Sequence, residues 1–261
     1  MQAAVSYDEA AVLAQETGAR MAQRLDLIRL TPHRIADIGC ATGDGIRALQ
    51  QRYKGAQPLA IDYALPMLQQ VRKRCALTQR LLRRTPHLLN ADVRALPLAA
   101  RSLDLVWSNL MLHWLDDPLP ALRELHRVLA VDGLLMFAML GPDTLKPLRA
   151  TSPSIRRFHD MHDIGDMLVT AGFADPVMDM EMISLTYASP RQFLADQRHL
   201  GVRNALLGQQ AWQHWRQQFH AWEKDSAGRH HADFEIIFGH AWKAQPRQTA
   251  DGRSVVQLHR R

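Results

Sequence analysis

The stretch DIGCATGDG, residues 37–45, decides the fold, and it lies between a short apolar run and an amphipathic one. Residues 34–40 (RIADIGC) are an apolar run that stops at a glycine-rich turn, which predicts a buried strand. Residues 44–53 (DGIRALQQRY) predict a helix that begins directly after the turn. Such a turn presents backbone N–H groups at a helix N-terminus and lets a ligand approach closely. The stretch therefore predicts a ligand-binding loop, although a glycine-rich turn can also serve tight packing alone.

The loop lacks the complete pattern of two common nucleotide-binding motifs. Counted from Gly39, the dinucleotide pattern G-x-G-x-x-G meets Ala41 and then Asp44 in place of two glycines. The Gly-Lys-Ser/Thr ending of a phosphate-binding P-loop is absent as well. An aspartate two residues before the first glycine suits a ligand that carries an ammonium group, so Asp37 is the candidate partner of such a group.

Strand and helix patterns alternate along the chain, which predicts an α/β fold with a doubly wound, mostly parallel sheet. A proline at position 66 fits the first turn of a helix, and Gly172 fits the end of another. Strands are expected at 34–40, 58–62, 88–93, 103–109, 132–140 (after a turn at 131–133), 177–187 and 234–244, and helices at 8–29, 44–53, 66–76, 117–129 and 164–173.

The pattern changes after residue 188, where two stretches, 189–202 and 208–225, are typical of helices. We therefore expect three parts in the chain. Residues 1–29 form an N-terminal helical segment over the cofactor site, and residues 30–243 form the main domain with a helical insertion at about 188–230. Residues 244–261 are polar and basic and are expected to be a disordered tail.

Composition narrows the class of protein. The 261 residues are 47% hydrophobic, enough for one large core, and no apolar run is long enough to span a membrane. Two cysteines are too few for a disulfide framework and show no metal-site spacing. We expect a cytoplasmic monomer without a metal, and the net charge of +6 favours an acidic partner.

Acidic residues stand at the ends of the second and third predicted strands. Asp62 ends the second strand and is placed to hold ribose hydroxyls, while the third strand ends in residues 91–93, with Asp92 near the expected adenine edge. Each also has a structural alternative, since Asp62 can cap the next helix and Asp92 can be a turn residue. Met67 and His113 can likewise be core residues.

This order of elements resembles the class I S-adenosylmethionine-dependent methyltransferases, in which a D-x-G-x-G-x-G loop cradles the methionine part of the cofactor. Ala41 departs from the usual glycine, and alanine favours ordinary backbone angles, so we expect no positive φ there. The resemblance implies S-adenosyl-L-methionine as cofactor, with Asp37, Gly39, Ala41, Gly43, Asp62, Tyr63, Met67, Asp92, Val93, Ser108 and Asn109 as its binding residues.

The region after the fourth strand bears on the methyl acceptor. It reads SNLMLHW, residues 108–114, without the N/D-P-P-Y/F loop of base amino methyltransferases, and no cysteine is present there to attack a base. Residues 3–15, 107–149 and 183–204 further resemble the malonyl-[acyl-carrier-protein] O-methyltransferases of biotin synthesis. That resemblance implies methylation of the free carboxylate of a malonyl thioester on an acidic carrier protein, with no nucleic acid or membrane as partner.

Two other functions stay open at this point. Methyltransferase-fold assembly factors of respiratory complex I, which hydroxylate arginine rather than methylate it, share the LHW and GPDTL-like stretches at 112–114 and 141–145. An RNA methyltransferase is the third reading, because the chain is basic.

Carboxylate methylation requires no general base, because an ordinary acid is already ionised at neutral pH. It does require a cation or hydrogen-bond donors for the acceptor oxygen, and His113, Arg203 and Tyr7 are the catalytic candidates. Two basic groups are candidates for docking the carrier by charge: residues 71–84, and Arg191 and Arg198 together with Arg203. A solvated helix face is the structural alternative for each arginine.

Overall fold

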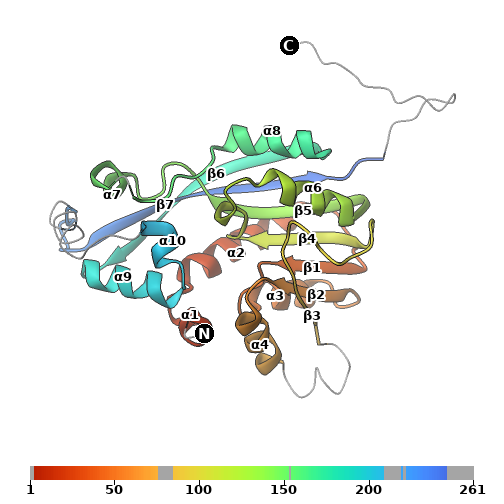
Figure 1. The fold of residues 1–261 in the computed structure, drawn as a ribbon, viewed down its shortest axis with the longest axis horizontal. Helices are drawn as coiled ribbons and strands as arrows, with labels where there is room; N and C mark the ends of the chain where they lie inside the picture. Colours follow the sequence, from red (N-terminus) through yellow and green to blue (C-terminus); the bar gives the residue numbers. More distant parts are fainter. Residues whose placement is uncertain (1–2, 76–84, 153, 209–218, 220–221, 246–261) are drawn as a thin grey trace, which may run out of the picture.

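The computed structural model describes residues 3–75, 85–152, 154–208, 219 and 222–245. One seven-stranded sheet with the order β3-β2-β1-β4-β5-β7-β6 runs through the molecule (Figure 1). Its strands are β1 (Arg34–Ile38), β2 (Gln57–Asp62), β3 (His87–Asn90), β4 (Leu103–Asn109), β5 (Leu129–Leu140), β6 (Ala174–Tyr187) and β7 (His230–Trp242).

The strands from β3 to β5 are parallel, and β7 is antiparallel to both of its neighbours. Strand β1 pairs with β2 on one side and with β4 on the other, so the strand order reverses at β1. In open α/β sheets, ligands bind outside the carboxyl ends of the strands at such a switch point. The loop at 39–43 follows β1 directly and therefore lies at this place.

Helices cover both faces of the sheet, because successive residues of a buried strand face opposite sides. Helices α2 (Val12–Leu25), α3 (Asp44–Arg52) and α4 (Leu65–Arg74) pack on one face, and α6 (Leu119–Val128) and α8 (Met161–Ala171) pack on the other. Neighbouring strand residues accordingly divide between two cores, with Ile35, Leu105 and Leu134 in the first and Ala36, Val106 and Leu135 in the second.

Five further helices in the described ranges belong to the segments around the carboxyl end of the parallel strands. Helix α1 (Ala3–Ala10) lies beside α9 (Pro190–His199), which is followed by α10 (Arg203–Leu207), as Figure 1 shows. The 3₁₀ helix η1 (Leu112–Trp114) follows β4, and α7 (Lys146–Thr151) follows β5. Helices α9 and α10 belong to the connection between β6 and β7, so segments from both ends of the chain meet above the switch point.

The predicted α/β fold with a mostly parallel sheet is confirmed, and three local predictions are wrong. The strand expected at 88–93 ends at Asn90, so Asp92 and Val93 lie in the loop after β3. The helix expected at 8–29 is two helices, α1 and α2, because the chain turns at Ala11 between them. The turn expected at 131–133 is an irregularity inside β5, where Asp132 adopts φ +61° and the register with β4 shifts. Most of the helix expected at 208–225, and the tail from 246 on, lie outside the described residues.

None of the helices within the described ranges is long and apolar enough to cross a membrane.

Candidate active site

The loop after β1 adopts left-handed backbone angles at three positions. Gly39, Ala41 and Gly43 have φ values of +76°, +45° and +94°. The expectation of an ordinary φ at Ala41 is therefore wrong. The left-handed conformation costs a non-glycine residue about 1–2 kcal/mol, and it is held here because the Ala41 N–H donates to Asp62 Oδ2 at 2.9 Å.

A small polar cavity lies between this loop and the end of β4. Its walls include Asp37, Trp107 and Asn109. Within the described part of the chain, Trp107 Nε1 and Asn109 Oδ1 are buried without a hydrogen-bond partner. Buried polar groups are nearly always paired, so an unpaired donor and acceptor beside a carboxylate indicate a ligand site. One N–H donor and two acceptors suit the carboxylate and ammonium groups of an amino acid.

Asp37 is 2% exposed, and this burial raises the pKa of its carboxyl to about 7. A hydrogen bond from the Ile46 backbone N–H acts in the opposite direction but is the smaller effect. A buried carboxylate without a cation is unfavourable, and a ligand ammonium would relieve that cost. Gly45 permits the arrangement, since a Cβ at this position would lie 2.6 Å from Asp37 Oδ2 and 2.9 Å from Trp107 Nε1.

A larger cavity of about 570 Å³ extends from the loop along the ends of β2 and β3. This volume lies in the range of about 300–1,000 Å³ that is common for small-molecule sites. It contains most of the predicted cofactor-binding residues, namely Gly39, Ala41, Asp62, Tyr63, Met67, Asp92 and Val93, together with Ile61, Arg94, Leu110 and Met111.

The two acids of this cavity have opposite electrostatic surroundings. Burial raises the pKa of Asp62, which accepts from the backbone N–H groups of Ala41 and Ala64 at 2.9 and 2.8 Å. Asp92 is paired with Arg94 at 2.6 Å, and that hydrogen bond lowers the pKa of Asp92 to about 2. Asp62 thus holds the loop through Ala41 as well as lining the cavity. It is not the cap of the next helix, since the N-cap of α4 is Ala64, and its role toward the cofactor stays a prediction.

Two predicted cofactor residues line none of these cavities. Gly43 is the N-cap of α3, and a Cβ there would lie 3.1 Å from the Val71 side chain, so its role is close packing. Ser108 is fully buried in β4, and its Oγ has no partner within the described residues.

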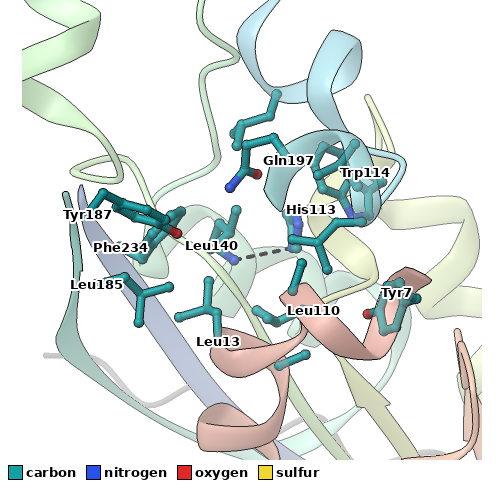
Figure 2. Close-up of a pocket in the computed structure, with 15 residues that line it drawn as sticks. Tyr7, Leu13, Leu110, His113, Trp114, Leu140, Leu185, Tyr187, Gln197 and Phe234 are labelled. Atoms are coloured by element: carbon teal, nitrogen blue, oxygen red, sulfur yellow. Dashed lines mark hydrogen bonds between the residues drawn. The ribbon is translucent and has the colours of Figure 1, made fainter. Parts of the chain in front are cut away.

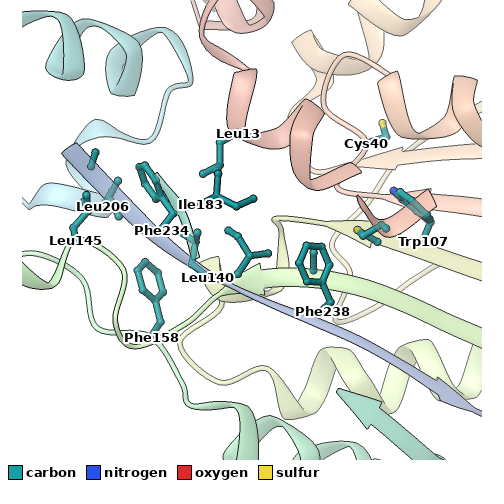
Figure 3. Close-up of a cluster of buried hydrophobic side chains, with 14 of the residues drawn as sticks. Leu13, Cys40, Trp107, Leu140, Leu145, Phe158, Ile183, Leu206, Phe234 and Phe238 are labelled. Atoms are coloured by element: carbon teal, nitrogen blue, oxygen red, sulfur yellow. The ribbon is translucent and has the colours of Figure 1, made fainter. Parts of the chain in front are cut away.

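A third cavity, which is mostly apolar, adjoins the larger cavity of about 570 Å³ (Figure 2). Its polar side chains are Tyr7, His113, Trp114, Tyr187 and Gln197, and no carboxylate, lysine or arginine is found among the described residues that line it. Part of its remaining wall belongs to the larger core, including Leu13, Leu140, Leu206 and Phe234, which Figure 3 shows.

His113 lies in the wall of this apolar cavity and is 3% exposed. Burial, with a smaller contribution from the charge of Arg156, lowers the pKa of His113 to about 3, so the ring is neutral. Its Nδ1 accepts from the Leu140 backbone N–H at 3.3 Å, which places the ring proton on Nε2. His113 can therefore donate a hydrogen bond there, but it cannot supply a cation.

Tyr7 lines all three cavities. Burial, reinforced by the charges of nearby aspartates, raises the pKa of its hydroxyl to about 12, so it stays protonated. Helix α1, which carries Tyr7, is fixed by the neighbouring Asp8. That carboxylate accepts from Thr42 Oγ1 at 2.6 Å and pairs with Arg74 on α4.

Arg203, the third catalytic candidate, does not line either main cavity. It is half-buried at the start of α10, next to Val202, which lines both.

Gly45 and Trp107 were not identified as site residues from the sequence. Gly45 stands in the same glycine-rich stretch as Gly39, whereas nothing local to β4 marks Trp107 as different from a core residue.

Comparisons with known proteins identify the family and the fold. The family described as a methyltransferase domain matches residues 36–137. The malonyl-[acyl-carrier protein] O-methyltransferase of Gallionella capsiferriformans is 45% identical over 98% of this chain and 92% of its own length. The enzyme of the same name from Laribacter hongkongensis is 46% identical over 99% and 93%.

Solved structures share the fold at low sequence identity. The YcgJ protein of Bacillus subtilis superposes with a TM-score of 0.63 at 16% identity, over 88% of this chain and 99% of its own. The Haemonchus contortus phosphoethanolamine N-methyltransferase 2, solved with S-adenosyl-L-methionine, gives a TM-score of 0.60 at 17% identity, over 93% and 57%.

Proposed function

The chain belongs to the malonyl-[acyl-carrier protein] O-methyltransferase family, and we propose that it methylates the free carboxylate of a malonyl thioester held on an acyl carrier protein. The cofactor is S-adenosyl-L-methionine, which supplies an electrophilic methyl group on a sulfonium. The product is a methyl ester whose charge is masked, and we assign the reaction to an early step of biotin synthesis.

One observation carries this proposal. The larger cavity and the apolar cavity share four wall residues: Tyr7, Leu110, Trp114 and Val202. A group bound in the first cavity and a group bound in the second would meet at this junction. Such an arrangement suits direct transfer between two ligands, because orientation alone can contribute about 7–11 kcal/mol to a reaction of this kind.

The residues present suit the cofactor. Asp37 and the unpaired atoms of Trp107 and Asn109 would hold its amino-acid part, with Asp62 and Asp92 placed along the larger cavity for its ribose and adenine. These assignments add Trp107 to the predicted cofactor-binding residues, and they take Gly43 out of direct contact with the cofactor.

The apolar cavity suits a carboxylate nucleophile that reacts with a cation. The acceptor needs no base, since an ordinary carboxyl is ionised at neutral pH. Opposite charges cancel during transfer, which a cavity without competing charges assists. Tyr7 and the neutral His113 offer hydrogen-bond donors there without adding a counter-charge that would lower the nucleophilicity of the carboxylate.

Docking of the acidic carrier is proposed for the surface of α9 and the start of α10. Arg191 and Arg198 are exposed on α9, Arg203 follows, and the same segment lines the apolar cavity through Gln197, Leu200 and Val202. Charge steering at such a surface raises association rates. Reversing Arg191 and Arg198 to Glu should raise KM for the carrier-bound substrate and leave cofactor affinity unchanged. An unchanged KM would reject this surface. Residues 76–84 of the other basic group lie outside the described residues.

The function is tested by mass spectrometry of malonyl-carrier protein incubated with the chain and S-adenosylmethionine. We expect a gain of one methyl on the malonyl group, which is lost in Asp62→Ala. Absence of transfer by the native chain, with the cofactor bound in calorimetry, would reject the acceptor while leaving the cofactor site intact. Hydroxylation of an arginine in a protein would favour the assembly-factor reading, and methyl transfer to RNA would favour the RNA methyltransferase reading.

A further inference from the structure

Helix α9 has a glutamine, Gln197, on its buried face, where an apolar side chain is expected. The buried residues of α9 are Phe193, Leu194 and Gln197, which share one face at helical spacing. Gln197 is 3% exposed. Glutamine is mostly found at the surface, so a buried one that is not required for packing calls for a polar partner.

That partner is not supplied by the protein. No described residue hydrogen-bonds the Gln197 side-chain amide, although the side chain lines the apolar cavity. Figure 2 shows the amide reaching from α9 toward the middle of the cavity. Gln192, on the same helix, is different. Its Oε1 accepts from the Ala188 N–H at 3.2 Å, while the Oγ of the N-cap Ser189 accepts from the Gln192 N–H, so the Gln192 side chain takes part in capping the start of α9.

The position of Gln197 defines which part of an acceptor it meets. It lines the apolar cavity but not the cofactor cavity, and it is not one of the four residues at their junction. Tyr7 is at that junction, and Figure 2 places it apart from Gln197 along the cavity. The carboxylate that receives the methyl group must lie at the junction. Gln197 therefore faces the part of the acceptor that points away from the methyl group.

We propose that Gln197 determines acceptor specificity by donating a hydrogen bond from Nε2 to the thioester carbonyl oxygen of the malonyl group. This inference rests on the proposed function, because it takes the acceptor to be a malonyl thioester. A buried amide selects for a ligand that pairs with it, since an analogue without the acceptor oxygen leaves the amide unpaired. The site would thus distinguish a β-carbonyl acid from a plain carboxylic acid of the same length.

The test compares two carrier-linked substrates with the same carboxylate. One is the malonyl thioester, and the other is the carboxyethyl thioether, in which a CH₂ replaces the thioester carbonyl. The variant is Gln197→Met, which keeps the length of the side chain and removes the amide. Gln192→Met is the matched control on the same helix, because it removes an amide that serves only the helix cap. Cofactor affinity, measured by calorimetry, reports whether each variant keeps the fold.

We expect the native chain to prefer the malonyl thioester by about 10- to 100-fold in kcat/KM. Gln197→Met should reduce that ratio to near one by slowing malonyl transfer alone, and Gln192→Met should leave the ratio unchanged. Equal loss on both substrates, or an undiminished ratio in Gln197→Met, would overturn the assignment of Gln197. A native chain that uses both substrates equally would also overturn it. A native chain that methylates neither substrate would reject the proposed function itself.

Discussion

Replacing Asp37 by Asn should make the ligand-free protein more stable at neutral pH while impairing the cofactor site. The pKa of Asp37 is raised from an ordinary 3.8 to about 7 by burial. A raised carboxyl pKa contributes stability that is complete below the unfolded pKa and is lost as pH rises through the folded one. A difference of about 3 in pKa corresponds to about 4 kcal/mol, an upper bound reached above pH 7. Asn remains uncharged and can still accept from the Ile46 N–H.

Urea unfolding of the native chain and Asp37→Asn, from pH 4 to pH 8 without cofactor, measures this effect. The stability of the variant relative to the native chain should rise with pH, steeply up to about pH 7 and little beyond. Other titrating groups contribute equally to both proteins and cancel in the difference. A difference that is constant across this pH range would refute the reasoning.

Asp104→Asn provides a control of opposite sign. Partial burial raises the pKa of Asp104, but hydrogen bonds from Arg34 and from the His33 and Arg34 backbone outweigh it, so the pKa is lowered. The stability that Asp104 contributes is therefore present above its unfolded pKa and is lost as pH falls through its folded one. Because this group is partly solvated, its variant should lose about 1 kcal/mol or less at neutral pH, with the loss shrinking in acid.

Three further substitutions test the site and its supports. Gly45→Ala places a Cβ 2.6 Å from a carboxylate oxygen of Asp37, so it should cost about 1–3 kcal/mol of stability and weaken cofactor binding in calorimetry. Gly55→Ala, where a Cβ meets nothing within 4 Å, is its control, and equal effects would contradict the steric argument. Tyr7→Phe should lower kcat about tenfold with cofactor affinity unchanged, and an unaltered kcat would remove the hydroxyl from the reaction. Glu235→Ala deletes the acceptor of a 2.5 Å hydrogen bond from the backbone of the loop after β5 and should cost about 1–3 kcal/mol in urea unfolding; a neutral result would show that water replaces the carboxylate.

Local patterns in the sequence were sufficient for the architecture and for most of the cofactor loop. Apolar runs that stop at glycine or at an acid predict buried parallel strands, because both faces of such a strand are covered. The carboxyl ends of parallel strands share one edge, so Asp62 and Asp92 could be placed along one cavity without coordinates. Gly39 could be assigned to the same edge, because it directly follows the first strand.

The sequence misled where a longer-range contact overrides a local preference. Alanine alone predicts an ordinary φ at position 41, but the hydrogen bond from its N–H to the Asp62 carboxylate holds the left-handed conformation. Asp62 is the last residue of β2, and the pairing of β1 with β2 brings the two residues together. The cost of the backbone angle is thus offset by an interaction that no local pattern contains.

Only the tertiary structure decided which residues line the apolar cavity. Tyr7 comes from the first helix, His113 from the segment after β4 and Gln197 from the insertion before β7, yet all three line one cavity. Sequence reasoning offered His113 as either a cation or a hydrogen-bond donor and gave no role to Gln197. Burial makes the histidine neutral, and no residue in the described part of the chain pairs with the Gln197 amide. Burial depends on packing among distant segments, so the periodicity of any one segment does not contain it.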